Sequence, residues 1–88
     1  METIYIVTKT YGYDSKKKAS TDVLLAFKGK AAAMAYKAEH FNDTLNNFMK
    51  EFPDDKLNVE DTEMKSKVSA EQEGFHTSYE ILERLLNC

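Results

Sequence analysis

The sequence predicts an α+β fold in which one long amphipathic helix packs on a small antiparallel sheet. Two observations carry this prediction: apolar residues with helical spacing over 30–52, and alternating apolar residues before and after that run. The chain has 88 residues, 42% of them hydrophobic, so a single domain, 1–88, with a modest core is expected. A long apolar helix face needs a sheet to cover it, and two strands alone are marginal, so a third strand is expected.

The first two strands are predicted at 4–11 and 20–27 and form a hairpin. β-branched and aromatic residues dominate TIYIVTKTY, and apolar residues alternate in STDVLLAF. The connection YGYDSKKKA contains Gly12, Asp14 and Ser15, which are typical turn residues, and it is too long for a two-residue turn. We therefore expect an antiparallel pair joined by a lysine-rich loop.

The helix is predicted over 30–52, with Gly29 as its N-cap. Pro53 disfavours helical geometry at the residue before it, so the helix should end there. The polar face, which includes Lys37, is expected to lie in water. The expected apolar stripe consists of Ala31, Met34, Ala38, Phe41, Leu45, Phe48 and Phe52.

Three segments follow the helix. Alternation in LNVEDTE predicts a third strand over 56–64, and the polar run 65–74 is interpreted as a linker or a frayed extension. The C-terminal segment, 78–87, has two interpretations. Alternating residues in FHTSYEI predict a strand, whereas Thr77 with Glu80 makes a capping-box pattern that predicts a helix. The paired leucines and the Glu and Arg content favour the helix.

Motifs of catalysis and cofactor binding are absent from the sequence. It has no nucleophile elbow, zinc-protease motif, P-loop or dinucleotide fingerprint, and its three glycines stand far apart. His40 has acidic neighbours on the predicted helix but too few ligands for a metal site. Cys88 is the only cysteine, which fits a reducing compartment. We expect no enzyme activity, cofactor, metal, signal peptide or membrane span, and a cytoplasmic location.

The charge is distributed unevenly along the chain. Residues 1–37 hold seven lysines against three acidic residues, whereas residues 38–88 hold five basic against twelve acidic residues, and the net charge is −3. This asymmetry suits recognition of a protein partner or pairing of two copies in a homodimer. Carboxylates on a rigid surface can meet a basic partner, and the acidic run after the helix supplies the candidate partner-binding residues: Asp54, Asp55, Glu60, Asp61 and Glu63.

The lysine-rich loop supports an alternative function. Lysines contact phosphates and tyrosines stack on bases, so the loop is a candidate nucleic-acid contact. A nucleic-acid-binding protein normally carries a larger basic footprint, and the sequence pI here is about 5.3. A small nucleic-acid-binding or regulatory protein is therefore the second hypothesis, and its candidate contacts are Lys16, Lys17, Lys18, Tyr11 and Tyr13.

One long stretch resembles small proteins of bacteriophages and mobile elements, including some anti-CRISPR proteins. It runs IYIVTKTYGYDSKKKASTDVLLAFKGKAAAMAYKAEHFN and continues to the acidic DDKLNVEDTEM, and the resemblance in layout covers 3–64. It implies a non-enzymatic protein-binding module that blocks a host defence or nucleic-acid-processing protein by steric occlusion, using a sheet edge and an acidic surface. Proteins with this layout have unrelated targets, so no functional residue is carried over.

Overall fold

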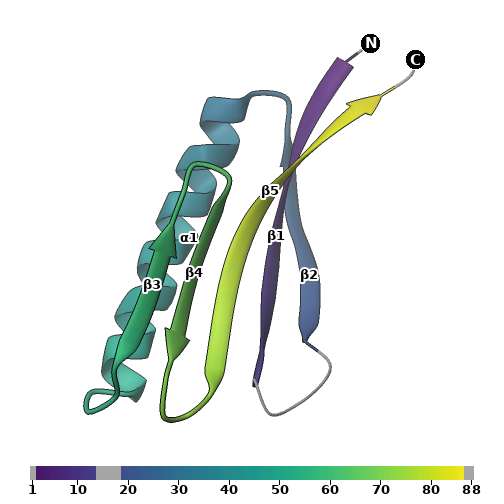
Figure 1. Cartoon of the computed structure of the whole chain (residues 1–88). Coiled ribbons are helices and arrows are strands. Elements are labelled where there is room, and N and C mark those ends of the chain that lie inside the picture. The colour runs from purple at the N-terminus through teal and green to yellow at the C-terminus, as the bar shows by residue number, and fades with distance from the viewer. Residues whose placement is uncertain (1, 14–18, 87–88) are drawn as a thin grey trace.

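A five-stranded antiparallel sheet carries one long helix on one of its faces (Figure 1). The computed structural model describes residues 2–13 and 19–86. The strand order is β2-β1-β5-β4-β3, so the first and last strands of the chain are neighbours in the sheet. The elements are β1 (Glu2–Tyr13), β2 (Ser20–Phe27), α1 (Lys30–Glu51), β3 (Leu57–Asp61), β4 (Lys65–Ala70) and β5 (Phe75–Leu86).

The hairpin and the helix lie where the alternation and the helical spacing predict them. β2 covers the predicted residues, and β1 is longer than 4–11 because all twelve of its residues pair with β5. Gly29 is the N-cap of α1. The helix ends one residue before the predicted 52: the Phe52 backbone N–H donates to the Phe48 carbonyl at 2.8 Å, and Pro53 follows. The α+β class, with a helix on an antiparallel sheet, is therefore confirmed.

The C-terminal segment is a strand, and the helix favoured for 78–87 is wrong. β5 pairs with β1 along its whole length and with β4 over Phe75–Glu80, so the backbone groups on both sides of the strand have partners there. Thr77, Tyr79 and Ile81 are buried beneath α1, at alternate positions. The helix propensity of its Leu, Glu and Arg residues is weak compared with two long-range pairings, so tertiary context decides the local structure.

The polar run 65–74 contains a strand rather than a linker. β4 pairs with β5 and with β3, and its inward residues Ser66, Val68 and Ala70 are all buried. The third strand is also shorter than 56–64, because β3 ends at Asp61 and a turn to β4 follows. Small inward residues hide the alternation of β4 in the sequence, where serine and alanine carry little hydrophobic signal.

The core lies between α1 and the sheet in two clusters. One is built from Phe41 and Phe48 of the helix against Val68, Ala70 and Tyr79. The other contains Val7, Ala33 and Ile81. The extra residue of a β-bulge in the pairing of β1 with β2, Leu24, packs against both clusters. Burial of these apolar side chains is the main force that holds the helix on the sheet.

The N-terminal half of α1 turns a different face inward from the one its sequence predicts. Ala33 and Lys37 are buried, whereas Ala31 and Ala38 of the expected stripe are exposed. Lys37, expected in water, is 4% exposed. Its ammonium group donates to the Thr62 carbonyl at 2.9 Å and to Ser66 Oγ at 2.6 Å. A run of alanines offers no contrast between its faces, so these polar partners and the sheet select the buried one.

Candidate functional site

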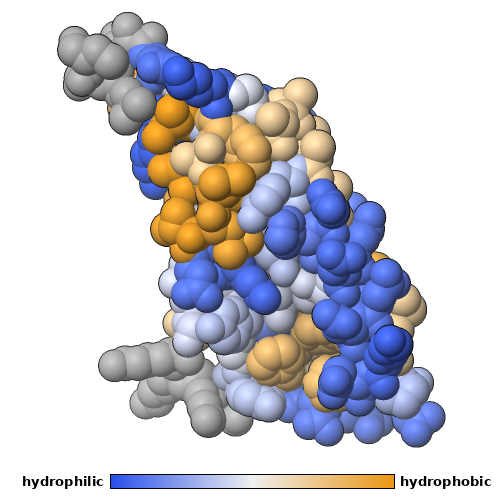
Figure 2. Space-filling view, turned by 180° about the vertical axis from the view of Figure 1, so that it is seen from behind, coloured by the Kyte–Doolittle hydropathy of each residue, from blue (hydrophilic) through white to orange (hydrophobic). Residues whose placement is uncertain are grey.

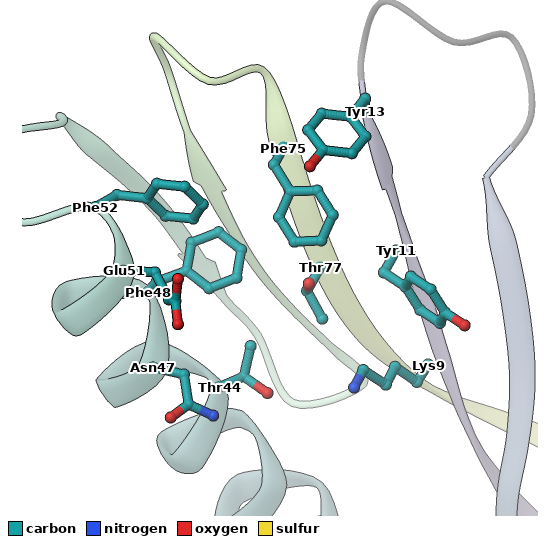
Figure 3. A pocket seen from close by; sticks show the side chains of 10 residues that line it. All are labelled: Lys9, Tyr11, Tyr13, Thr44, Asn47, Phe48, Glu51, Phe52, Phe75 and Thr77. Atoms are coloured by element: carbon teal, nitrogen blue, oxygen red, sulfur yellow. The ribbon is translucent and has the colours of Figure 1, made fainter.

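A groove of about 310 Å³ opens between the C-terminal half of α1 and the neighbouring ends of β1 and β5 (Figure 3). Aromatic side chains from all three elements line it: Tyr11, Tyr13, Phe48, Phe52 and Phe75. Thr44, Asn47 and Thr77 add polar atoms, and Lys9 and Glu51 add opposite charges. The volume lies in the lower range of small-ligand sites, and such sites are mostly apolar with a few polar groups.

The aromatic rings of the groove form one connected wall. Tyr13 and Phe75 have ring centroids 4.9 Å apart, and Phe48 stacks on Phe75 at 5.6 Å with an angle of 25° between the rings. Phe52 meets the Phe48 ring edge-on at 5.5 Å. Contacts of this kind favour the observed arrangement of the rings, so the wall is formed without a ligand.

Lys9 brings a cation to the other end of the groove. Its ammonium lies 5.5 Å from the centroid of the Tyr11 ring and 5.9 Å from that of Tyr79, and it is directed toward Thr44 on the helix (Figure 3). The Tyr79 hydroxyl and Thr44 Oγ1 share a hydrogen bond of 2.6 Å, which fixes the ring beneath the ammonium. No carboxylate of residues 2–13 or 19–86 forms an ion pair with Lys9.

A second hollow, of about 210 Å³, continues from the groove past the end of α1. The two share Glu51 and Phe52, and the second is otherwise lined by the turn after the helix and the turn between β4 and β5. Its charged residues are all acidic: Glu51, Asp54, Asp55 and Glu73. The combined surface therefore runs from a cation, across aromatic rings, to a group of carboxylates.

The five acids predicted to bind a partner do not form one surface. Asp55 accepts hydrogen bonds from the backbone N–H groups of Gln72 and Glu73, at 2.9 and 3.1 Å, and so joins two turns. Asp54 lies beside it and is exposed. Glu60 is exposed on β3, opposite Lys67 of β4.

The other two predicted acids are paired within the protein. Asp61 accepts a hydrogen bond of 2.6 Å from Ser66 Oγ and lies 3.7 Å from the Lys37 ammonium. Glu63 pairs with Lys30 at 2.6 Å, and this hydrogen bond and positive charge lower the pKa of the Glu63 carboxyl from its ordinary value. These contacts hold α1 against the β3–β4 hairpin, which gives Asp61 and Glu63 a structural role.

The predicted phosphate contacts divide into two groups. Tyr11 and Tyr13 line the groove, whereas Lys16, Lys17 and Lys18 lie outside the described residues. Lys9 was missed by the sequence reasoning, although a signal for it exists: residues two apart on a strand share a face, so Lys9, Tyr11 and Tyr13 point the same way. Phe48, Phe52 and Phe75 were expected only as core or strand residues.

The two outer strands of the sheet differ in how well they are protected. β3 is five residues long and carries acids, and its Val59 is 48% exposed. β2 is eight residues long and contains one charge, Asp22, with Val23 72% exposed and Leu25 47% exposed. Short length and charge are the usual protections of a sheet edge, and β2 has little of either.

An apolar area adjoins β2 on the helix side of the sheet. Leu25 pairs with Val7, whose side chain is buried under the helix, so both belong to that side. Leu85 pairs with Thr3, which is four residues before Val7 on β1 and therefore shares its face. Leu85 thus lies on the same side of the sheet, and it is 64% exposed. Figure 2 shows the helix side with a large apolar area in its upper half and a smaller one below, separated by polar residues.

Other kinds of site find little support in the described part of the chain. No three His, Cys, Asp or Glu side chains gather there as a set that could hold a metal ion. The single helix among residues 2–13 and 19–86 is not apolar enough to cross a membrane. No protein-family model, curated protein or solved structure matches this chain.

Proposed function

We propose that this protein is a non-enzymatic protein-binding module that takes up an extended segment of a partner along the outer edge of β2. The contrast between the two sheet edges carries the proposal. β3 is short and acidic, whereas β2 is longer and exposes Val23 and Leu25 with a single charge. An edge of this kind is a template for an additional strand, whose main-chain hydrogen bonds supply affinity.

Side-chain contacts on both faces of an added strand would supply specificity. Val23 pairs with Thr8 and projects to the face that α1 does not cover, whereas Leu25 projects to the helix side. A partner strand would place alternate side chains against each of them. Binding of this kind blocks a partner by occupying its segment, as expected of a phage or mobile-element protein that inhibits a host defence protein by steric occlusion.

The test compares the two edges with matched substitutions. Val23→Lys places a charge on β2, and Val59→Lys places the same charge on β3; both positions are exposed, so neither change should alter folding. The tagged wild-type protein is used to isolate a stoichiometric partner from host lysate, and binding of the purified partner is then measured with each variant. We expect V23K to weaken binding at least about tenfold and V59K to leave it unchanged.

Hydrogen exchange provides a second readout of the same proposal. Amides on the outer side of β2 should exchange more slowly when the partner is bound. Protection of β3 alone, or equal binding by V23K and the wild type, would contradict the proposal. Light scattering shows whether β2 instead pairs with a second copy of the protein. If the wild type has the mass of a dimer and V23K has the mass of a monomer, the segment that binds β2 belongs to a second copy and not to a different partner.

A further inference from the structure

The groove and the second hollow form one elongated surface whose two ends differ in charge. Lys9 lies at one end, and Glu51, Asp54 and Glu73 lie at the other. Between them stands the connected wall of aromatic rings described above. This surface lies on the helix side of β1 and β5, and no residue of β2 lines it. A ligand for it can therefore be considered without the β2 edge.

The Lys9 end requires an anionic group on the ligand. The side chain is half-buried against the faces of Tyr11 and Tyr79. Asp22, which lies opposite Lys9 in the pairing of β1 with β2, forms no ion pair with it. Ring faces attract an ammonium group, but they replace only part of the hydration that it loses on burial. A carboxylate that reaches Lys9 would gain a charge-assisted hydrogen bond in a partly dry site.

The middle of the surface fits a flat apolar group. Phe48 and Phe75 are stacked, and Tyr13 and Phe52 flank them at 4.9 and 5.5 Å between centroids. An aromatic side chain can pack against such a wall in offset or edge-on geometry, while leaving few polar atoms unsatisfied. Aromatic residues that bury in a preformed pocket are the usual anchors of a protein interface.

The far end requires a cation and rejects a second anion. Glu51 is exposed at the boundary of the two hollows, and it forms no ion pair with any residue in 2–13 or 19–86. Asp54 and Glu73 extend the negative charge beyond it. A nucleic-acid strand with a phosphate at Lys9 would bring the next phosphates toward these carboxylates, which is unfavourable. A lysine or arginine side chain fits the same place.

We propose that this surface binds an extended segment of a partner protein in which an acidic, an aromatic and a basic residue occupy alternate positions. Alternate residues of an extended chain project to the same side, so all three would face the groove. The acidic side chain contacts Lys9, the ring packs on Phe48 and Phe75, and the basic side chain contacts Glu51. The charges and rings of the site therefore specify which side chains the partner segment presents, and this binding does not depend on the β2 edge.

The test uses two capped synthetic peptides of the same composition. One has the order Glu-Ser-Trp-Ser-Lys, and the other has the order Glu-Ser-Lys-Ser-Trp, in which the aromatic residue no longer lies between the two charges whichever way the chain runs. The protein contains no tryptophan, so indole fluorescence reports the peptide alone. We expect saturable binding of the first peptide and at least about tenfold weaker binding of the second. Equal binding of both peptides, or no saturable binding of the first up to about 1 mM, would overturn the proposal.

Charge reversal in the protein separates a specific site from general attraction. Lys9→Gln and Glu51→Gln should each weaken the first peptide by about tenfold, whereas Lys50→Gln, an exposed control outside both hollows, should leave it unchanged. Glu51→Lys, which makes both ends of the surface positive, should prefer a third peptide, Glu-Ser-Trp-Ser-Glu, over the first. Circular dichroism checks that each variant is folded, and a folded Glu51→Lys protein that still prefers the first peptide refutes the assignment of the basic side chain to Glu51.

A labelled single-stranded oligonucleotide is the competing ligand in the same assay. The proposal expects it to bind more weakly than the first peptide at the same salt concentration, and to gain affinity in Glu51→Gln, which removes a carboxylate that repels phosphates. Tighter binding that falls steeply with salt and is lost in Lys9→Gln would assign the groove to nucleic acid instead.

Discussion

Replacing Lys37 by methionine tests whether the buried polar contact between α1 and the β3–β4 hairpin stabilises the fold. The Lys37 side chain is 4% exposed, and its ammonium donates to the Thr62 carbonyl at 2.9 Å and to Ser66 Oγ at 2.6 Å. The carboxylate of Asp61 lies 3.7 Å away but is 65% exposed. Methionine keeps the apolar part of the side chain and removes the charge and both hydrogen bonds.

The expected loss follows from two opposing contributions. Hydrogen bonds to a charged group contribute roughly 1.5–3 kcal/mol each, and relief of the cost of burying the cation offsets part of that sum. Asp61 regains water when the lysine is removed, because it is mostly exposed, so no buried charge is stranded. We expect Lys37→Met to lower the free energy of unfolding by about 1–2 kcal/mol.

Alanine at the same position separates packing from polar contact. Compared with methionine, alanine lacks three further side-chain heavy atoms at this buried site, which should cost about 2 kcal/mol more than methionine. Urea unfolding followed by circular dichroism measures both values, with Lys50→Met, at an exposed position of the same helix, as the control. A Lys37→Met protein at least as stable as the wild type would refute the reasoning, because the contact would then contribute no net stability.

Three further predictions concern the turns and the surface ion pair. Asp55→Ala should lower the free energy of unfolding by about 1–2 kcal/mol, because two backbone N–H groups lose their acceptor; faster amide exchange at Gln72 and Glu73 would locate the effect, and unchanged exchange would contradict it. Gly74→Ala should cost about 1 kcal/mol in urea unfolding, because Gly74 has a φ of 68°; equal stability would mean that the turn adapts. The Lys30–Glu63 pair lowers the pKa of Glu63 from its ordinary 4.5, so its contribution is present above that value and is lost as the pH falls through the lowered pKa. Glu63→Gln should therefore remove a small, salt-sensitive part of the acid dependence of stability, and an identical pH profile in the variant would show that the pair contributes nothing.

The candidate site was only partly visible in the sequence. Tyr11 and Tyr13 were identified, but as neighbours of the lysine loop and not as the wall of a groove. Lys9 follows from the alternation of β1 once the strand is known. Phe48, Phe52 and Phe75 come from two elements that are distant along the chain, and no local pattern says that their rings meet.

Elements whose signals are local can be predicted from the sequence alone. Alternating β-branched and apolar residues placed β1 and β2, and helical spacing with Gly29 and Pro53 placed α1 and its ends. Composition and charge also follow from the sequence alone. These features need no information from distant parts of the chain.

The strand structure of β4 and β5 and the inward face of the first half of α1 depend on contacts between distant parts of the chain. β5 is a strand because residues more than seventy positions earlier pair with it, as Val7 does with Ile81. Lys37 turns inward because Thr62 and Ser66, far along the chain, supply oxygen atoms to its ammonium. Where local propensity is weak or divided, the hydrogen bonds and burial that long-range contacts provide exceed it and set the structure.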